Sequence, residues 1–372
     1  MKKTIFKKFY LDALKAFFIT SFTIVSIIWI LQAVNFLDFV SEDGHSLLTY
    51  FKYSFYNIPK IFIKTYLLAF FISFYYLLIN YENNNQLLIF WSNGILKTIF
   101  LKNVLIFVIF LYLIFLFFSF FLAPFSQNKA RFLIKKSNLE FFPSLIKEKK
   151  FIDTVEDFTI FLESKNQNQL ENILIKDSSN PNNIQIIISQ KGSLINNDNQ
   201  KILTLKNGKI INTNLDKKNT ILNFETTNID LNQYSTKSVT DTKVQELSSF
   251  IIIECIFNLY KNRNFDSEEI NCKKNFLDKL NQEMYERLFI PMYLFIISII
   301  VTYLILKPHN NVNYNKWKIK IFLFSVLVII LSELSVNMVS DNVNKNLAVL
   351  LFLPLIFFFL YFLFLKKSSS ST

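Results

Sequence analysis

The sequence predicts an α-helical membrane protein with six transmembrane helices, three on each side of an inserted β-rich domain. Three observations predict this fold: long apolar runs occur in two groups of three, a polar segment separates the groups, and 52% of the residues are hydrophobic against 18% charged. We expect spans 1–3 in residues 1–123, the inserted domain in 124–288 and spans 4–6 in 289–372. The six spans are Ala13–Asn35, Ile61–Tyr81, Ile99–Ala123, Phe289–Leu306, Ile319–Val339 and Leu347–Leu365.

Each run is long enough to cross a bilayer, because about 20 residues at a rise of about 1.5 Å cover a hydrocarbon core of about 30 Å. The first run is about twice as long as the apolar part of a signal peptide, and no small-residue cleavage site follows it, so we expect a retained helix. An even number of spans puts both termini on one side of the membrane.

Lysines in the short flanks indicate which side that is, since short cytoplasmic segments are enriched in lysine and arginine. They cluster before and at the start of the first span, between the fourth span and the start of the fifth, and after the sixth, at Lys2, Lys3, Lys7, Lys8, Lys15, Lys307, Lys316, Lys318, Lys320, Lys366 and Lys367. We therefore expect both termini in the cytoplasm and residues 124–288 outside it.

The inserted domain shows short apolar stretches separated by polar turn residues, which is typical of a β-sandwich, a jelly roll or an open barrel. The predicted strands are Phe158–Leu162, Ile173–Ile175, Ile184–Ser189, Ile202–Leu205, Ile210–Asn212 and Thr220–Phe224, with turns at Asn182–Asn183, Asn207–Gly208 and Asp216–Lys217. Such a domain is either inert or offers a groove or sheet edge to a ligand or partner strand.

Two helices are predicted between these strands and the fourth span. Val244–Tyr260 contains an apolar run too short to cross a membrane, so it is either a core helix or lies on the membrane surface. Ser267–Arg287 is charged and leads into the fourth span. Cys255 and Cys272 both fall in this region, and the sequence leaves open whether they form a disulfide or two free buried thiols.

Several classes of chemistry are disfavoured. The four glycines do not form a P-loop or a dinucleotide-binding fingerprint. The two histidines, His45 and His309, are expected on opposite sides of the membrane, which disfavours a histidine-based zinc site. We therefore expect no enzyme activity, cofactor or metal site. The net charge of +12 comes from scattered lysines without a basic helix, so we expect no nucleic-acid binding and instead attraction to anionic membrane lipid.

Polar residues in or beside the spans are the candidate functional residues, because burying them in lipid is costly and they usually face a cavity or another helix. Gln32, Asn35 and Asp38 share a face of the first span, and Glu333 and Asn337 share a face of the fifth. These five either line a gate or only hold helices together. Lys52, Lys60 and Lys64 either reach lipid headgroups or bind an anionic substrate.

A short amphipathic segment, residues 83–98, joins the second and third spans on the predicted cytoplasmic side. Leu87, Leu88, Phe90, Trp91 and Ile95 form its apolar face. Such a helix either docks in a groove of a soluble partner or lies flat on the membrane.

Local segments support a specific resemblance. Gln86–Gly94, Gln185–Gly192, Leu205–Gly208 and Glu283–Pro291 with Arg287 resemble motifs of the lipopolysaccharide-export permeases, the LptF/LptG (YjgP/YjgQ) family, and Trp29–Pro59 looks closer to the LptF branch. The resemblance covers nearly the whole chain. It departs at Gln86, where the family usually has an acidic residue, and at Trp91, where the family has a basic or polar residue. These two departures put a coupling salt bridge in doubt.

The resemblance implies a periplasmic β-jellyroll as the inserted domain, in a protein of the bacterial inner membrane. It implies lipopolysaccharide as the substrate, entering through lateral gates formed by the first and fifth helices. It also implies three partners: an LptB-like cytoplasmic ATPase dimer, an LptG-like sister permease and an LptC-like periplasmic jellyroll protein. The ATPase-coupling residues would be Gln86, Leu87, Phe90, Trp91 and Gly94.

Two other readings remain. The chain is alternatively a membrane-anchored scaffold or receptor that binds a partner without transport. Other ABC permeases with a large outer domain have four spans and place that domain after the first, so the arrangement of three and three disfavours them.

Overall fold

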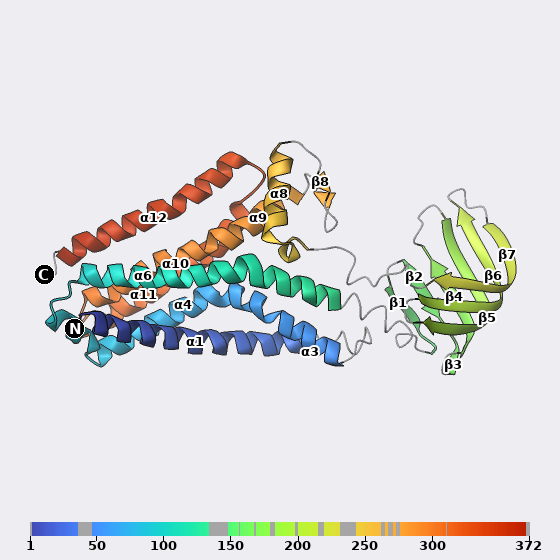
Figure 1. Cartoon of the computed structure of the whole chain (residues 1–372), viewed down its shortest axis with the longest axis horizontal. Helices are drawn as coiled ribbons and strands as arrows, with labels where there is room; N and C mark the ends of the chain where they lie inside the picture. The colour runs from blue at the N-terminus through green and yellow to red at the C-terminus, as the bar shows by residue number, and fades with distance from the viewer. Residues whose placement is uncertain are drawn as a thin grey trace. The chain divides into compact units, whose positions relative to one another are not determined.

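The computed structural model describes residues 2–35, 47–133, 148–155, 157–166, 169–178, 183–197, 200–214, 219–230, 243–261, 265–266, 271–272, 276–309 and 311–369 (Figure 1). The chain forms two compact units. The first comprises Met1–Leu31, Asn57–Asn128 and Thr242–Thr372, and the second comprises Gln32–Tyr56 and Lys129–Asp241. Asp38, Asn182 and the predicted turn Asp216–Lys217 lie outside the described residues.

Six helices in the described part of the chain are long and apolar enough to cross a membrane, which confirms the predicted spans. The first span is α1 (Lys2–Asn35), the second is α3 (Leu47–Tyr56) with α4 (Ile58–Asn83), and the third is α6 (Lys97–Phe117) with the π-helix η1 (Phe118–Leu122). The fourth span consists of α9 (Leu277–Leu288), η5 (Ile290–Met292), α10 (Tyr293–Thr302) and η6 (Tyr303–Leu306). The fifth is α11 (Tyr314–Met338) and the sixth is α12 (Val343–Ser369).

The second and fourth spans form the centre of the bundle. Within the most apolar segment of each span, 61% and 72% of their residues are buried, against 11%, 28% and 17% for the first, fifth and sixth spans. Aromatic rings fill much of this core, with Phe9, Tyr66, Phe70, Phe71 and Phe100 almost completely buried. The peripheral helices α1, α11 and α12 therefore turn most of their apolar surface outward, to lipid or to another protein.

The inserted domain is an antiparallel sheet. Its seven strands follow the order β1-β2-β4-β5-β6-β7, with β3 pairing beside β4, so all consecutive strands except β2 and β3 pair with each other. The strands are β1 (Phe151–Val155), β2 (Phe158–Phe161), β3 (Ser164–Asn166), β4 (Gln169–Asp177), β5 (Asn183–Asn197), β6 (Gln200–Asn214) and β7 (Asn219–Asp230). Apolar residues on one face form its core, including Phe158, Ile160, Ile175, Leu203 and Leu205.

The predicted turn at Asn207–Gly208 is wrong, because both residues lie inside the single long strand β6, which joins the two strands predicted on either side of them. Asn207 has φ of 54°, and Asn172 in β4 has φ of 50°. Asparagine tolerates this left-handed conformation in strand kinks as well as in turns, so the local signal did not separate the two.

A row of kinks crosses the sheet at this level. In each of four strands two successive residues point away from the core: Glu171 and Asn172, Gln190 and Lys191, Lys206 and Asn207, Glu225 and Thr226. Each of these four strands has one extra residue at the kink. Pairing therefore stays in register across the row, as between Glu171 and Lys191 on one side of it and Ile173 and Ser189 on the other. Apolar residues thereby face one core on both sides of the row.

The connector between the sheet and the fourth span contains the short helix η3 (Val244–Glu246) and α8 (Ser249–Tyr260), as predicted. The predicted helix from Ser267 is wrong in its first part, since Asn271–Cys272 (β9) pairs with Phe265–Asp266 (β8) and α9 begins only at Leu277. Cys255 and Cys272 form a disulfide, with their Cα atoms 5.8 Å apart. This cross-link ties β9 to α8.

Candidate functional site

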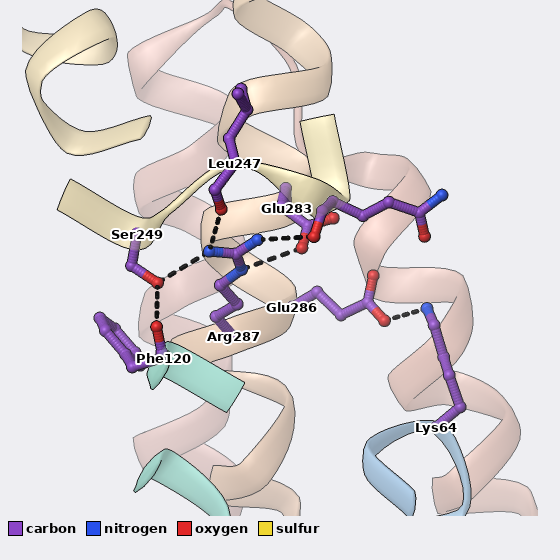
Figure 2. Close-up of polar contacts among 8 residues, drawn as sticks. Lys64, Phe120, Leu247, Ser249, Glu283, Glu286 and Arg287 are labelled. Carbon is purple, nitrogen blue, oxygen red and sulfur yellow. Dashed lines mark hydrogen bonds and ion pairs between the residues drawn. The ribbon is translucent and has the colours of Figure 1, made fainter. Parts of the chain in front are cut away.

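Charged residues of α9 and α4 meet at one end of the first unit (Figure 2). Glu283, Glu286 and Arg287 lie within one turn of α9, just before the apolar part of the fourth span. Lys60 and Lys64 are one turn apart on α4, whose start is favoured by a proline in its first turn. The two helices thus bring five charges together.

Arg287 is the buried centre of this cluster, with only 3% of its side chain exposed. Its Nε donates to Glu283 Oε1 at 2.9 Å, its Nη1 donates to the Leu247 carbonyl at 3.1 Å and to Ser249 Oγ at 2.7 Å, and its Nη2 donates to the Gln245 carbonyl at 3.2 Å. A buried arginine needs such partners, because an unpaired buried charge is very costly. Arg287 therefore fixes the connector to the fourth span.

Ser249 extends this network to the third span. Its hydroxyl accepts from Arg287 and donates to the Phe120 carbonyl at 3.0 Å (Figure 2). Phe120 lies in the π-helix η1, and Pro124, four residues later, has no backbone N–H to donate to the Phe120 carbonyl. The connector, the third span and the fourth span are thus joined through one guanidinium group.

Lys64 forms an ion pair with Glu286 beside this network. The Lys64 side chain is 49% exposed and the Glu286 side chain 22% exposed. Because half of the Lys64 side chain is exposed, the pair does not enclose its ammonium group. Lys64 is therefore held in place but remains able to meet a ligand.

Two pockets adjoin the pair. The first, of about 390 Å³, is lined by residues that include Lys60, Lys64, Gln245, Glu283 and Arg287. The second, of about 350 Å³, is lined by Lys64, Glu286 and Glu333 among others. Both volumes include solvent at the open mouth of the pocket, so the enclosed space is smaller and does not hold several acyl chains.

Cations exceed anions around the first pocket. Lys60, Lys64 and Arg287 supply three positive charges, and Glu283 and Glu286 supply two negative ones. Arg287 and Lys64 have carboxylate partners, whereas no ion pair of Lys60 is found among the described residues. Lys60 is therefore the lysine of this pocket whose charge is best placed to attract an anion.

The structure brings together only some of the residues singled out from the sequence. Lys60, Lys64 and Glu333 meet at the two pockets, and Asn337 is exposed one turn further along α11. Gln32, Asn35 and Lys52 belong to the second unit: Gln32 is partly buried near the end of α1, Asn35 is exposed at that end, and Lys52 is exposed on α3.

The short segment between the second and third spans contains the helix α5 (Gln86–Ser92). Leu87 and Phe90 are 2% exposed and pack into the bundle, where the Phe90 ring lies 5.5 Å from that of Phe6 and 5.3 Å from that of Phe100. Leu88 and Ile89 are 59% and 50% exposed. Leu88 and Ile89 thus lie on the outer side of α5, while Leu87 and Phe90 anchor the helix.

Gly94 ends this helix. It has φ of 66°, and the amide of Ile95 donates back to the Phe90 carbonyl at 3.1 Å, which is the Schellman arrangement for a helix C-terminus. Gln86 opens α5 after Asn85, which is also left-handed at φ of 55°. Trp91 is partly buried and lies against Phe100 at 5.9 Å between rings.

Sequence reasoning gave Glu283, Glu286 and Arg287 no functional role, although it noted Glu283 and Arg287 in a family-like segment. Their spacing of three and four residues before an apolar run was the available signal. It did not identify their partners, because Lys64 is 222 positions from Glu286 in the sequence.

A family model described as "Lipopolysaccharide export system permease LptF/LptG" matches residues 10–367, nearly the whole chain. The match does not distinguish LptF from LptG. No curated protein gives a significant match. Together with the six apolar helices, the match indicates a multi-pass inner-membrane permease that is not itself an ATPase. This chain, with its antiparallel β-domain between two groups of three spans, belongs to the LptF/LptG family of lipopolysaccharide export permeases.

Proposed function

We propose that the chain is one permease subunit of an ABC-type complex that extracts lipopolysaccharide from the outer leaflet of the inner membrane and passes it to a periplasmic jellyroll bridge. The observation that carries the proposal is the family match over residues 10–367 on a chain with three spans, a β-domain and three spans. Flanking lysines support cytoplasmic termini and a periplasmic β-domain.

A sister permease, LptG-like if this chain is of the LptF branch, would complete the substrate path. Exposing acyl chains to water costs about 0.8 kcal/mol per CH₂, so the path must be apolar throughout. The two pockets of this chain are too small for several acyl chains. The outward apolar surfaces of α1 and α11 suit a cavity shared with a second subunit, with Gln32, Asn35, Glu333 and Asn337 near its gates.

Energy would come from a separate LptB-like ATPase dimer that docks on α5. Leu88 and Ile89 supply an exposed apolar patch for such a contact, and Leu87 and Phe90 would transmit movement of α5 into the bundle core. On the other side of the membrane, β1 and β7 are the outer strands of the sheet among the described residues, and an LptC-like jellyroll protein would add a strand at one of these edges.

Lys60 and Lys64 would bind phosphate groups of the lipid at the first pocket. Lys64 would exchange Glu286 for phosphate, and Lys60 has no carboxylate partner among the described residues to give up. Lys52, exposed on α3, is a third candidate for such a contact.

Photo-crosslinking of lipopolysaccharide in cells tests these assignments. Lys60→Ala and Lys64→Ala should lower crosslinking and growth, whereas Lys345→Ala, an exposed lysine on α12 outside both pockets, should not. If Lys64 acts on phosphate, the double variant Lys64→Ala/Glu286→Gln should remain defective. Full recovery in the double variant would instead mean that Lys64 only neutralises Glu286.

Co-purification in detergent tests the complex as a whole. A cytoplasmic ATPase and a second six-span subunit should accompany the chain, and ATP hydrolysis should be absent from the chain purified alone. A chain that is stable alone and recruits no ATPase would support the scaffold or receptor function instead.

A further inference from the structure

Helix α8 has three distinct faces. Ile252, Cys255 and Leu259 are buried against α9 in a small core of their own. Phe250, Ile253, Phe257 and Tyr260 form an apolar stripe at helical spacing, 68%, 45%, 58% and 43% exposed. Glu254, Asn258 and Lys261 lie on the remaining side of the helix. A water-soluble helix would not expose such a stripe without a partner for it.

Both ends of α8 are attached to the end of the membrane bundle. Ser249 donates to the Phe120 carbonyl in the third span, and the Tyr260 hydroxyl donates to the Asp341 carbonyl, between α11 and α12, at 3.4 Å. Within this unit α8 runs across the spans and not along them (Figure 1). Its 12 residues extend about 18 Å, too short to cross a hydrocarbon core of about 30 Å.

The stripe continues the outward surface of the third span. The Phe250 ring lies 6.3 Å from the ring of Phe121, which is 52% exposed, and Phe117 one turn earlier is 57% exposed. These two residues belong to an apolar spanning helix, so their exposed rings face lipid or a membrane partner. The stripe of α8 begins where this surface ends.

We propose that α8 lies flat in the interfacial layer of the bilayer, on the same side as the β-domain, with its apolar stripe between headgroups and acyl chains. The aromatic rings and the Tyr260 hydroxyl suit this layer, where one end of a side chain is apolar and the other wet. Lys261, whose ammonium lies 4.0 Å from the centre of the Phe257 ring, borders the stripe and reaches headgroup phosphates.

This contact would set the depth of the connector in the membrane. The disulfide ties α8 to β9, and the buried face of α8 packs on α9, so a helix fixed at the bilayer surface also fixes the start of the fourth span. The inference concerns phospholipid and stands apart from the proposed transport function.

Nitroxide labels on the full-length protein in phospholipid nanodiscs, with any subunits that purify with it, test the proposal. Single cysteines are introduced as Phe257→Cys and Ile253→Cys on the stripe, Glu254→Cys on the polar side and Leu113→Cys on the exposed surface of α6 as a lipid reference. The two native cysteines are disulfide-bonded and buried, so they do not take the label. Relaxation by oxygen, which partitions into lipid, is compared with relaxation by a water-soluble nickel chelate.

The ratio of oxygen to nickel relaxation should exceed one at the stripe positions, as at Leu113→Cys, and fall below one at Glu254→Cys. A ratio below one at both stripe positions would place the stripe in water and overturn the proposal. Low accessibility to both reagents would also overturn it, because the stripe would then be covered by protein.

Discussion

Replacing Arg287 with alanine should destabilise the protein more than any surface substitution on the same helix. The change removes four hydrogen bonds from a guanidinium that is 3% exposed, and it leaves Glu283, whose side chain is 19% exposed, without its cation. Breaking a buried ion pair by removing one partner costs about 3–5 kcal/mol. We expect a loss in this range, with the connector detached from the fourth span first.

Thermal unfolding followed by intrinsic fluorescence in detergent measures this loss. Lys279→Ala, an exposed lysine on α9, is the matched control and should change stability by less than about 0.5 kcal/mol. Arg287→Lys should recover only part of the loss, because an ammonium group cannot reproduce the planar fork that reaches Glu283, Leu247 and Gln245 together.

A double variant separates the charge from the packing. Arg287→Met/Glu283→Leu leaves no buried charge unpaired and should be more stable than Arg287→Ala. The reasoning would fail if Arg287→Ala unfolded at the same temperature as the Lys279→Ala control. It would also fail if the double variant were less stable than Arg287→Ala.

Three further outcomes are expected. Gly208→Ala should destabilise the β-domain by about 1–3 kcal/mol in thermal unfolding, because a Cβ would lie within 3.0 Å of the Ile188 carbonyl oxygen and of the Phe224 ring; an unchanged melting temperature would contradict this. Gly94→Ala should lower the stability by about 1–2 kcal/mol because residue 94 has φ of 66°, although the space around it is open. Gly94→Asn should lower it less, since asparagine tolerates a left-handed backbone, and equal effects would show that the backbone conformation is not the cause. Leu88→Ser/Ile89→Ser should reduce ATPase co-purification at unchanged thermal stability, whereas Leu87→Ala should cost about 2–5 kcal/mol of stability; the reverse pattern would exchange the two roles.

The number and position of the spans were readable from the sequence, whereas several local assignments were not. The six spans followed from run length alone, but Asn207–Gly208 carried the same signal for a turn and for a kink inside β6. The predicted helix from Ser267 failed because Asn271–Cys272 pairs with Phe265–Asp266 as a strand, which the charged sequence pattern does not indicate. The sequence had also left the disulfide between Cys255 and Cys272 open.

The candidate site was also predictable only in part. Lys60, Lys64 and Glu333 were identified as polar residues at costly positions, and they do meet at the pockets. The apolar face of α5 was found as a set, but which members face inward depends on Phe6 and Phe100, which lie in other helices.

The sequence by itself determined the features that depend on neighbouring residues. A bilayer requires each spanning helix to satisfy its own backbone hydrogen bonds, so long apolar runs reveal the spans. Tertiary structure alone decided the partners of Arg287, the pairing of Lys64 with Glu286 and the buried face of α5. Those contacts join segments far apart in the chain, and their energies depend on burial, which exists only once the helices have packed.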